Sequence, residues 1–397
     1  MLRYLSGGES HGKQLTAVIC EYPSGVEIDP SVVNNELKRR QAGYGRGGRM
    51  KIESDTVEIV SGVRWGKTTG APITLVIENK DWENWEKIMS VCPDDVDNSK
   101  IITRPRPGHS DLPGMVKYNH KDARNILERS SARETAIRTA VGSFGKILLN
   151  IFDINIFSHV KCIGSVTAET KGLSYKEIQK RILKSELNCA DPKAEIEMKK
   201  IIDKAKDKGD SLGGIVEIII TGMPVGIGSY IHWDKKLDGI LAQAIMSVQA
   251  IKGVEIGMGM DVGRNLGSIV QDSIYYSRNK SDYLEGHFKD FPFYHKQNNA
   301  GGIEGGMSNG EPIVINAAMK PIPTLMSPLD SVDVNTKEPF KAVKERSDVC
   351  AVPAAGVVCE AAAAWALAEI FLEKFGNDAI EDIIANYKNY IKRVKEF

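Results

Sequence analysis

The stretch Gly62 to Ile73 reads GVRWGKTTGAPI, and its pattern returns at Gly302 to Ile313 as GIEGGMSNGEPI. Two shorter echoes keep the same order along the chain, Pro23 to Val26 with Pro224 to Ile227, and Glu128 to Ser130 with Glu345 to Ser347. The offsets are similar but unequal, as duplicated halves with different insertions would give. The sequence therefore predicts one domain over 1–397, made of two related halves near 1–200 and 210–397.

Hydrophobic patterns around the echoes predict both strands and helices. Short β-branched runs predict strands at Val57–Ser61, Ile73–Ile77, Ile215–Ile220 and Ile313–Ala317. Helices are expected at Val32–Arg40, where Asp29-Pro30 provides a start signal, at the small-residue runs Glu128–Leu149 and Ala354–Phe375, and within the charged segment Lys171–Asp210. Helices and strands do not alternate regularly, so we expect an α+β fold with mostly antiparallel sheets packed around helices.

Composition narrows the class of protein. The 397 residues carry 52 basic and 52 acidic side chains, which argues against a protein that coats nucleic acid. The six cysteines include no CxxC pair, so reduced thiols are expected in place of a disulfide framework or zinc site. The apolar run Ala361–Ala368 is too short to cross a bilayer, and the first residues lack the core of a signal peptide. We expect a cytoplasmic protein.

Three stretches match known motifs in letters but not in context. Gly8–Gly12 fits the G-x-S-x-G nucleophile elbow, yet at most one strand precedes it; a serine hydrolase acting through Ser10 stays as the alternative function. Gly43–Gly48 fits G-x-G-x-x-G, but it follows a helix instead of a strand, against a Rossmann site. Gly62–Thr68 ends like a P-loop but lacks its first glycine.

The stretch Arg39–Arg49, RRQAGYGRGGR, has the densest cluster of charge and glycine in the chain. Glycine lets the backbone approach a ligand closely, and arginine offers paired donors to phosphate or carboxylate. A mobile surface turn is an equally good interpretation of this stretch alone. An RGG-type nucleic-acid segment is disfavoured, because the stretch is short, unrepeated and part of a neutral chain.

Four further clusters combine basic residues with stiff or helix-start sequences. Arg104–Asp111 holds Arg106 and His109 between prolines and a glycine, either as a site or as a plain connector. Arg129–Glu134 fits an anion site or an ordinary helix cap. The others are Lys320–Thr324 and Glu345–Asp348. Together the clusters predict a rigid site for polyanionic small molecules, with two candidate histidine acids, one carboxylate and no metal.

These motifs together resemble the chorismate synthase family. The resemblance runs nearly end to end and rests on six motifs in the family's order: GESHG at 8–12, RQAGYGRGGR at 40–49, RPRPGH at 104–109, RSSARE at 129–134, KPIPT at 320–324 and RSD at 346–348. It implies a β-α-β sandwich, internally duplicated, and assembly as a homotetramer.

The resemblance also implies the reaction. Members of that family catalyse anti-1,4 elimination of phosphate from 5-enolpyruvylshikimate 3-phosphate, giving chorismate, the last step of the shikimate pathway. They need reduced FMN without net redox change. By this resemblance His11 is the acid for the departing phosphate, His109 protonates the reduced flavin near N1, and Asp348 acts through flavin N5 as the base.

Binding residues follow from the same resemblance. The substrate pocket would contain Ser10, Arg40, Arg46, Arg49, Arg106, Ser131, Arg133 and Arg346. Flavin contacts would come from Arg129, Ser130, Ser131, Gln249, Ala250, Gly305, Lys320, Pro321, Ile322, Pro323, Thr324 and Arg346. Arg40 and Arg46 would bind the phosphate of NADP in members that reduce their own flavin. No extra domain for that reduction is evident, so NADPH is a possible reductant and an external one is favoured.

One departure from the family pattern is the long stretch Leu284–Asn299. Its histidines, His287 and His295, are expected on the surface, like His120, His159 and His232. The stretch has two open interpretations, an ordered flap near the flavin and a contact between subunits.

Overall fold

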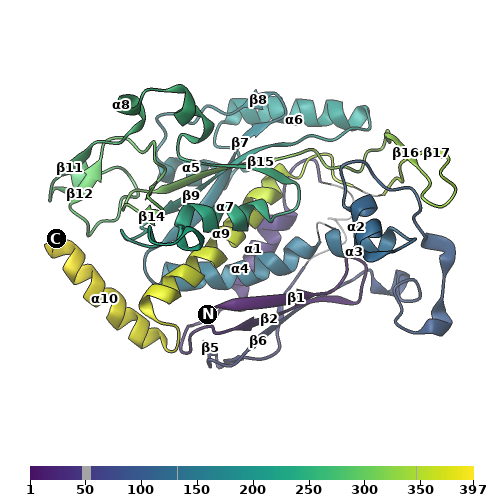
Figure 1. The fold of residues 1–397 in the computed structure, drawn as a ribbon, viewed down its shortest axis with the longest axis horizontal. Coiled ribbons are helices and arrows are strands. Elements are labelled where there is room, and N and C mark those ends of the chain that lie inside the picture. Colours follow the sequence, from purple (N-terminus) through teal and green to yellow (C-terminus); the bar gives the residue numbers. More distant parts are fainter. Residues whose placement is uncertain (47–54, 132, 346) are drawn as a thin grey trace.

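Two antiparallel sheets enclose a layer of helices in the computed structural model of the chain, which describes residues 1–46, 55–131, 133–345 and 347–397 (Figure 1). The first sheet has the order β1 (Arg3–Gly7), β2 (Gln14–Cys20), β6 (Ile73–Glu78) and β3 (Glu58–Ile59). The second has the order β10 (Ile251–Ile256), β15 (Ile313–Met319), β9 (Gly214–Thr221), β7 (Asn155–Ile163) and β8 (Val166–Thr167). The α+β class and the antiparallel pairing are confirmed.

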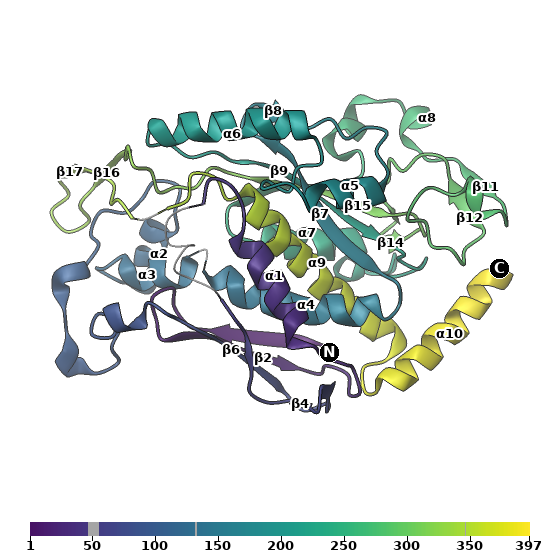
Figure 2. The same ribbon diagram turned by 180° about the vertical axis from the view of Figure 1, so that it is seen from behind.

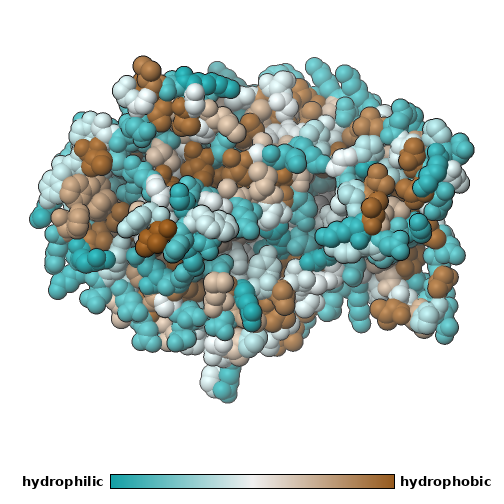
Figure 3. All heavy atoms as spheres, viewed as in Figure 1, coloured by the Kyte–Doolittle hydropathy of each residue, from teal (hydrophilic) through white to brown (hydrophobic). Residues whose placement is uncertain are grey.

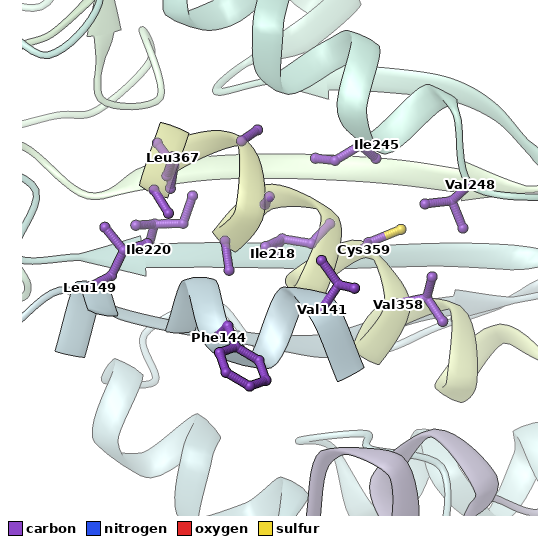
Figure 4. Close-up of a cluster of buried hydrophobic side chains, with 14 of the residues drawn as sticks. Val141, Phe144, Leu149, Ile218, Ile220, Ile245, Val248, Val358, Cys359 and Leu367 are labelled. Atoms are coloured by element: carbon purple, nitrogen blue, oxygen red, sulfur yellow. The ribbon is translucent and has the colours of Figure 1, made fainter. Parts of the chain in front are cut away.

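Four helices fill the space between the sheets: α1 (Pro30–Gln41), α4 (Glu134–Asn150), α7 (Leu237–Met246) and α9 (Val352–Phe375). Figure 4 shows Ile218 and Ile220 of β9 pointing into the same core as Val141 of α4 and Leu367 of α9. The helices α5 (Tyr175–Ile182) and α6 (Pro192–Asp207) lie outside the second sheet (Figure 2). The alternation along β9 explains this, because Ile219 points outward and packs with Ile178 and Ile182 of α5.

The remaining elements extend from this sandwich at two ends (Figures 1 and 2). One end carries α2 (Asp111–Tyr118), α3 (Arg124–Ser130) and the hairpin of β16 (Asp330–Val332) and β17 (Pro339–Lys341). The other end carries α8 (Gly267–Val270), α10 (Ile380–Glu396), the β11 (Ile274–Tyr276) and β12 (Phe293–His295) hairpin, and the β13 (Ile303–Glu304) and β14 (Met307–Ser308) hairpin. A further hairpin joins β4 (Val63–Arg64) to β5 (Lys67–Thr68).

The central contact is between α4 and α9, where small residues of both helices meet. Gly142 faces Ala361, and Gly145 faces Ala364 one turn further along, so the two helices run in the same direction. A methyl group on Gly142 would lie 2.5 Å from Ala361 Cβ. Such close approach removes the facing backbones from water. Because the two helices are parallel, both begin at the same end of the molecule.

Matching hydrogen bonds join the echoed segments. Thr68 Oγ1 donates to the Pro23 carbonyl and accepts from the Val26 amide, at 2.6 and 2.9 Å. Ser308 Oγ makes the same two bonds with Pro224 and Ile227, at 2.6 and 2.8 Å. The two-repeat organisation stays a prediction, and this shared pattern favours it.

Several predicted elements are confirmed and one helix is corrected. The helix after Asp29 forms, and Asp29 caps it by accepting from the Ser31 amide at 2.8 Å. The helix predicted over Glu128–Leu149 is wrong as one piece, because α3 ends at Ser130 and α4 begins at Glu134. Ser131 adopts an extended conformation there, and its hydroxyl donates to Ser10 Oγ at 2.9 Å. A tertiary hydrogen bond thus competes with the helix.

The apolar run Ala361–Ala368 is the middle part of a longer apolar helix, α9. The 24 residues of α9 have the length and composition of a membrane span, but 89% of the most apolar window is buried inside the molecule. The helix therefore serves as the core of the sandwich. On the face in Figure 3 hydrophilic residues dominate, and apolar residues form small separate groups.

Three of the histidines expected on the surface are buried instead. His159, His287 and His295 are 1%, 8% and 5% exposed. His159 lies 2.9 Å from Glu217 Oε2, and His287 lies 3.0 Å from Glu311 Oε1. Carboxylates from neighbouring strands and loops supply the polar partners that make this burial tolerable.

The stretch Leu284–Asn299 is fastened to the C-terminal end of the chain. Its strand β12 pairs with β11. Phe288 packs against Ile391 and Val394 of α10. The stretch lies at the end of the molecule opposite α2 and α3 (Figures 1 and 2).

A buried carboxylate ties α9 to its neighbours. Glu360 is fully buried, and Arg39 donates to both of its oxygens at 2.8 Å. Lys146 Nζ and Ser158 Oγ also donate to it. Burial opposes ionisation of this carboxyl, but the nearby charges of Lys146 and Arg39 outweigh burial and lower the pKa of Glu360 to about 2.

We predict that Gly142→Ala destabilises the protein by about 1–3 kcal/mol, because the added methyl overlaps Ala361. Gly239→Ala in α7 is the matched control, since nothing lies within 4 Å of its new methyl. There the helix propensity of alanine should stabilise by up to about 1 kcal/mol. Urea unfolding followed by circular dichroism measures both. Equal stability of Gly142→Ala and the natural chain would contradict the close packing.

We predict that Glu360→Gln costs about 3 kcal/mol at pH 7, because it removes the fully buried carboxylate that Arg39 and Lys146 share and leaves both cations to Glu36. The pKa of Glu360 is lower when folded, so the ionised form stabilises the fold above the ordinary value of 4.5. That contribution is lost as pH falls from 4.5 towards 2, and the gap between the natural chain and the variant should narrow over this window. Urea unfolding at several pH values measures the gap.

Glu373→Gln is the control for this pH series. Glu373 pairs with Lys235 at 2.6 Å on the surface, so the change should cost less than about 1 kcal/mol at every pH. A pH-independent gap for Glu360→Gln would show that its charge does not contribute to stability.

Candidate active site

The turn between β1 and β2 presents Ser10 and His11 to the end of α3. Ser10 is fully buried, and its amide donates to the Glu128 carbonyl at 2.8 Å. His11 Nδ1 lies 2.9 and 3.0 Å from the two carboxylate oxygens of Glu128. Strand β2 follows this turn where a nucleophile elbow needs a helix, so the hydrolase alternative has no structural support.

The loop at 104–111 forms a second polar cluster. Arg106 is 7% exposed, and its Nε donates to Asp111 Oδ2 at 2.8 Å. His109 Nδ1 lies 2.5 Å from Asp111 Oδ1. Burial opposes ionisation of Asp111, but hydrogen bonds from His109 and Arg106 outweigh burial and hold the pKa of this carboxyl well below its ordinary value. Asp111 therefore stays charged beside His109.

The loop at 320–324 closes over the second cluster from the other half of the chain. Thr324 Oγ1 accepts from Arg106 Nη1 at 2.9 Å. Lys320 Nζ donates to the Gly108 carbonyl, and the Lys320 amide donates to the Ala250 carbonyl at 2.9 Å. Pro321, Ile322 and Pro323 lie between these anchored residues, so the predicted stiff loop is held at both ends.

A third group combines arginines from α1 and from the break before α4. Arg40 and Arg133 are 3% and 5% exposed, and both contact Asp55, with N–O distances of 2.8 and 3.5 Å. Arg46 Nη1 lies 3.1 Å from Asp348 Oδ2. The structure thus gives each of these guanidinium groups a carboxylate partner.

Residues around the start of α4 complete the arrangement. Arg129 donates to the carbonyls of Ser6 and Gly8, both at 3.1 Å. The Ser130 hydroxyl donates back to the Ile126 carbonyl at 2.8 Å, within its own helix. Gln249 Nε2 donates to Glu134 Oε2 at 2.7 Å.

Helix starts converge on the same region. The cluster Arg129–Arg133 leads into α4, and the cluster Glu345–Asp348 leads into α9. Because these helices are parallel, both N-termini lie at the site end of the sandwich (Figure 1). A helix N-terminus carries partial positive charge and unpaired amides, which favour anions.

Gly305 is the predicted site residue that stands apart. It lies in the turn between β13 and β14, near β11 and β12 (Figures 1 and 2). That end of the molecule is opposite α2 and α3. Arg49 and Arg346 fall outside the described residues.

Acidic and aromatic partners in this region carry roles that no local sequence pattern assigned. These partners are Asp55, Trp85, Asp111 and Glu128. Asp111 ends the basic cluster at 104–111, and Glu128 directly precedes the motif at 129–134, so their positions beside candidate residues were the available signal. Trp85 stacks on His11 with ring centroids 3.7 Å apart and gave no local signal. Among the residues that the structure describes, no group of three or more potential metal ligands occurs.

The fold and the site define an α+β protein whose buried arginines and two candidate acid histidines lie with carboxylate partners at the end of the sandwich where α4 and α9 begin. The family model described as chorismate synthase matches residues 2–372. The chorismate synthase of Geobacter metallireducens is 55% identical over 397 residues and covers all of both chains. That of Desulforamulus reducens is 52% identical over the same length, again with full coverage of both chains.

A solved structure agrees with these relatives. A crystal structure of chorismate synthase superposes with a TM-score of 0.79 at 41% identity, covering 100% of this chain and 99% of that one. This chain belongs to the chorismate synthase family, whose members are lyases of the shikimate pathway that use reduced flavin.

We predict that Thr324→Val costs about 1–3 kcal/mol, because it leaves a buried donor of Arg106 without its acceptor. Thr324→Ser keeps the hydroxyl and should recover most of this loss. Chemical unfolding of both variants measures the difference. A valine variant no less stable than the serine variant would show that this hydrogen bond does not hold the two loops together.

Proposed function

We propose that this chain binds 5-enolpyruvylshikimate 3-phosphate together with reduced FMN and eliminates phosphate in the anti-1,4 sense to give chorismate. One observation carries the proposal. Arginines that are no more than 7% exposed lie in or beside the segments that hold His11 and His109, and Thr324 from the other half of the chain accepts a hydrogen bond from one of them, Arg106. These are Arg40, Arg106, Arg124 and Arg133.

The negative charges of the proposed ligands match this set of buried arginines. The proposed substrate carries one phosphate and two carboxylates, and FMN carries another phosphate. Guanidinium groups hold such anions through paired hydrogen bonds. Fixed cations stabilise the negative charge that gathers on a departing phosphate, without reorganisation during the reaction. The two helix N-termini add to this field.

Each candidate acid and base has a fixed partner in the structure. His11 is the acid for the departing phosphate, and Glu128 holds its Nδ1. His109 is the second acid, with Nδ1 held by Asp111. Asp348 is the base, and Arg46 lies beside its carboxylate. Reduced flavin, when bound, supplies transient electron donation with no net redox change.

The binding residues of the proposal are those of the family pattern. Ser10, Arg40, Arg46, Arg49, Arg106, Ser131, Arg133 and Arg346 would bind substrate. Arg129–Ser131, Gln249, Ala250, Gly305, Lys320–Thr324 and Arg346 would bind FMN. Buried polar atoms near these loops support a ligand here. Among the described residues, Arg40 Nε, Ser110 Oγ and Gln249 Oε1 have no hydrogen-bond partner. Unsatisfied donors and acceptors fit a ligand with phosphate and ring amide groups.

Assembly and reductant form a further part of the proposal. We propose a cytoplasmic homotetramer, with neither nucleic acid nor a membrane as a partner. The separation of Gly305 from the pocket supports an oligomer, because a second copy could supply that glycine. We also propose an external reductant.

The test is anaerobic turnover. The protein, chemically reduced FMN and 5-enolpyruvylshikimate 3-phosphate are mixed, and chorismate absorbance and phosphate release are followed together. The proposal expects both products in equal amounts, and none with oxidised FMN. Phosphate without chorismate would overturn it. Turnover with NADPH and oxidised FMN alone would overturn the external reductant.

We predict that His109→Ala lowers turnover by about 10²–10⁴-fold through loss of an acid, while oxidised FMN binds with much smaller change. His120→Ala removes an exposed histidine and serves as the control. Steady-state rates and flavin titration measure both effects. Turnover of His109→Ala close to that of the natural chain would remove His109 from the acid role.

A further inference from the structure

The surroundings of His11 are more elaborate than a simple acid needs. Glu128 is 2% exposed and grips both the side chain and the backbone of His11. Its oxygens lie 2.9 and 3.0 Å from Nδ1, and Oε2 accepts from the His11 amide at 2.8 Å. The Glu128 carbonyl accepts from the preceding amide, that of Ser10, at 2.8 Å. The imidazole therefore cannot turn without losing the contact of Nδ1 with Glu128, while the backbone on either side is held by the same residue.

An arginine completes the charge balance behind Glu128. Arg124 Nη1 donates to Glu128 Oε1 at 3.0 Å, and Arg124 Nη2 donates to Glu345 at 3.2 Å. Glu128 and Glu345 hold the same place in the two Glu-Arg-Ser echoes. Burial opposes ionisation of Glu128, but His11 and then Arg124 outweigh burial and lower its pKa below the ordinary value. Glu128 thus faces His11 as a carboxylate at neutral pH.

The face of the His11 ring is covered by an aromatic residue from another part of the chain. Trp85 stacks on it with a centroid distance of 3.7 Å and an interplanar angle of 23°. Trp85 Nε1 donates to Asp81 at 3.1 Å. Asn79 Nδ2 donates to the Gly12 carbonyl at 2.9 Å, which fastens this segment beside His11. The ring is therefore held along its edge by Glu128 and across its face by Trp85.

We propose that Glu128 and Trp85 are positioning residues for His11 in the elimination. A carboxylate at Nδ1 favours the tautomer with its proton on Nδ1 and stabilises the imidazolium, so proton transfer falls to Nε2. Stacking fixes the ring plane and thus the direction in which Nε2 delivers the proton. This inference rests on the proposed function of His11 and adds two residues that act through it.

The first test separates kcat from KM. Glu128→Gln keeps the shape and loses the charge, and we expect kcat to fall about 10²–10⁴-fold with little change in KM. Trp85→Ala should lower kcat about 10-fold, while Trp85→Phe keeps an aromatic ring and should recover most of the rate. A kcat for Glu128→Gln within about 3-fold of the natural chain would overturn the role of Glu128.

A double-mutant cycle shows whether Glu128 acts through His11. In a His11→Ala background, the added Glu128→Gln change should slow turnover by less than about 3-fold, because the group it positions is gone. A full further loss in that background would overturn the inference and assign Glu128 a separate role. Wild-type turnover of His11→Ala alone would overturn the acid role of His11, and the catalytic part of this inference with it.

NMR of the imidazole nitrogens tests the geometry without turnover. In ¹⁵N-histidine-labelled protein, the His11 signal, assigned by its absence in His11→Ala, should report a protonated Nδ1. Glu128→Gln should shift it towards the Nε2–H tautomer. An unchanged tautomer would overturn the positioning by Glu128, whatever the activity assays show.

Glu217→Gln is the matched control for both experiments. It makes the same change in another histidine–glutamate pair, where His159 Nε2 lies 2.9 Å from Glu217, on strands β7 and β9. It should alter the His159 signal and leave kcat unchanged. A comparable fall in kcat from Glu217→Gln would show that loss of any such buried pair slows the enzyme, and would overturn a specific role for Glu128.

Discussion

Close packing of α4 against α9 is the contact on which the rest of the structure depends. Glycine at 142 and 145 lets the α4 backbone meet Ala361 and Ala364 of α9. Because the helices are parallel, their starts share one end of the sandwich. The two sheets cover this pair from either side, and Glu360 joins α9 to α1 and β7 through buried charge. The positions of the site loops follow from where these two helices begin.

Charge at the site is balanced before any ligand binds. The buried arginines each lie beside a carboxylate: Asp55 serves Arg40 and Arg133, Asp111 serves Arg106, and Glu128 serves Arg124. Uncompensated guanidinium groups at this depth would be costly. The same carboxylates reach the histidines, since Asp111 contacts His109 and Glu128 contacts His11. One set of acidic groups therefore stabilises the folded arginine cluster and orients the candidate acids.

The two ends of the molecule differ in character. The site end gathers polar loops from both halves around the helix starts. The opposite end joins the Leu284–Asn299 stretch to α10 through Phe288, Ile391 and Val394. Gly305, a proposed flavin contact, lies at that second end. In the proposed oligomer, a second copy of the chain would bring this glycine to the flavin site. A glycine placed there is consistent with a pocket completed by a second copy.

Much of this architecture could be read from local patterns. Asp29-Pro30 marked the start of α1, β-branched runs marked β6, β9 and β15, and small-residue runs marked the helices α4 and α9, because each signal acts over a few residues. The six motifs likewise named most of the residues that converge at the site. What the pattern could not show were contacts between distant segments. The break at Ser131 depends on a hydrogen bond to Ser10, the burial of His159 depends on Glu217, and the stacking of His11 depends on Trp85. Such pairings follow from three-dimensional packing, so they emerge once the chain is folded.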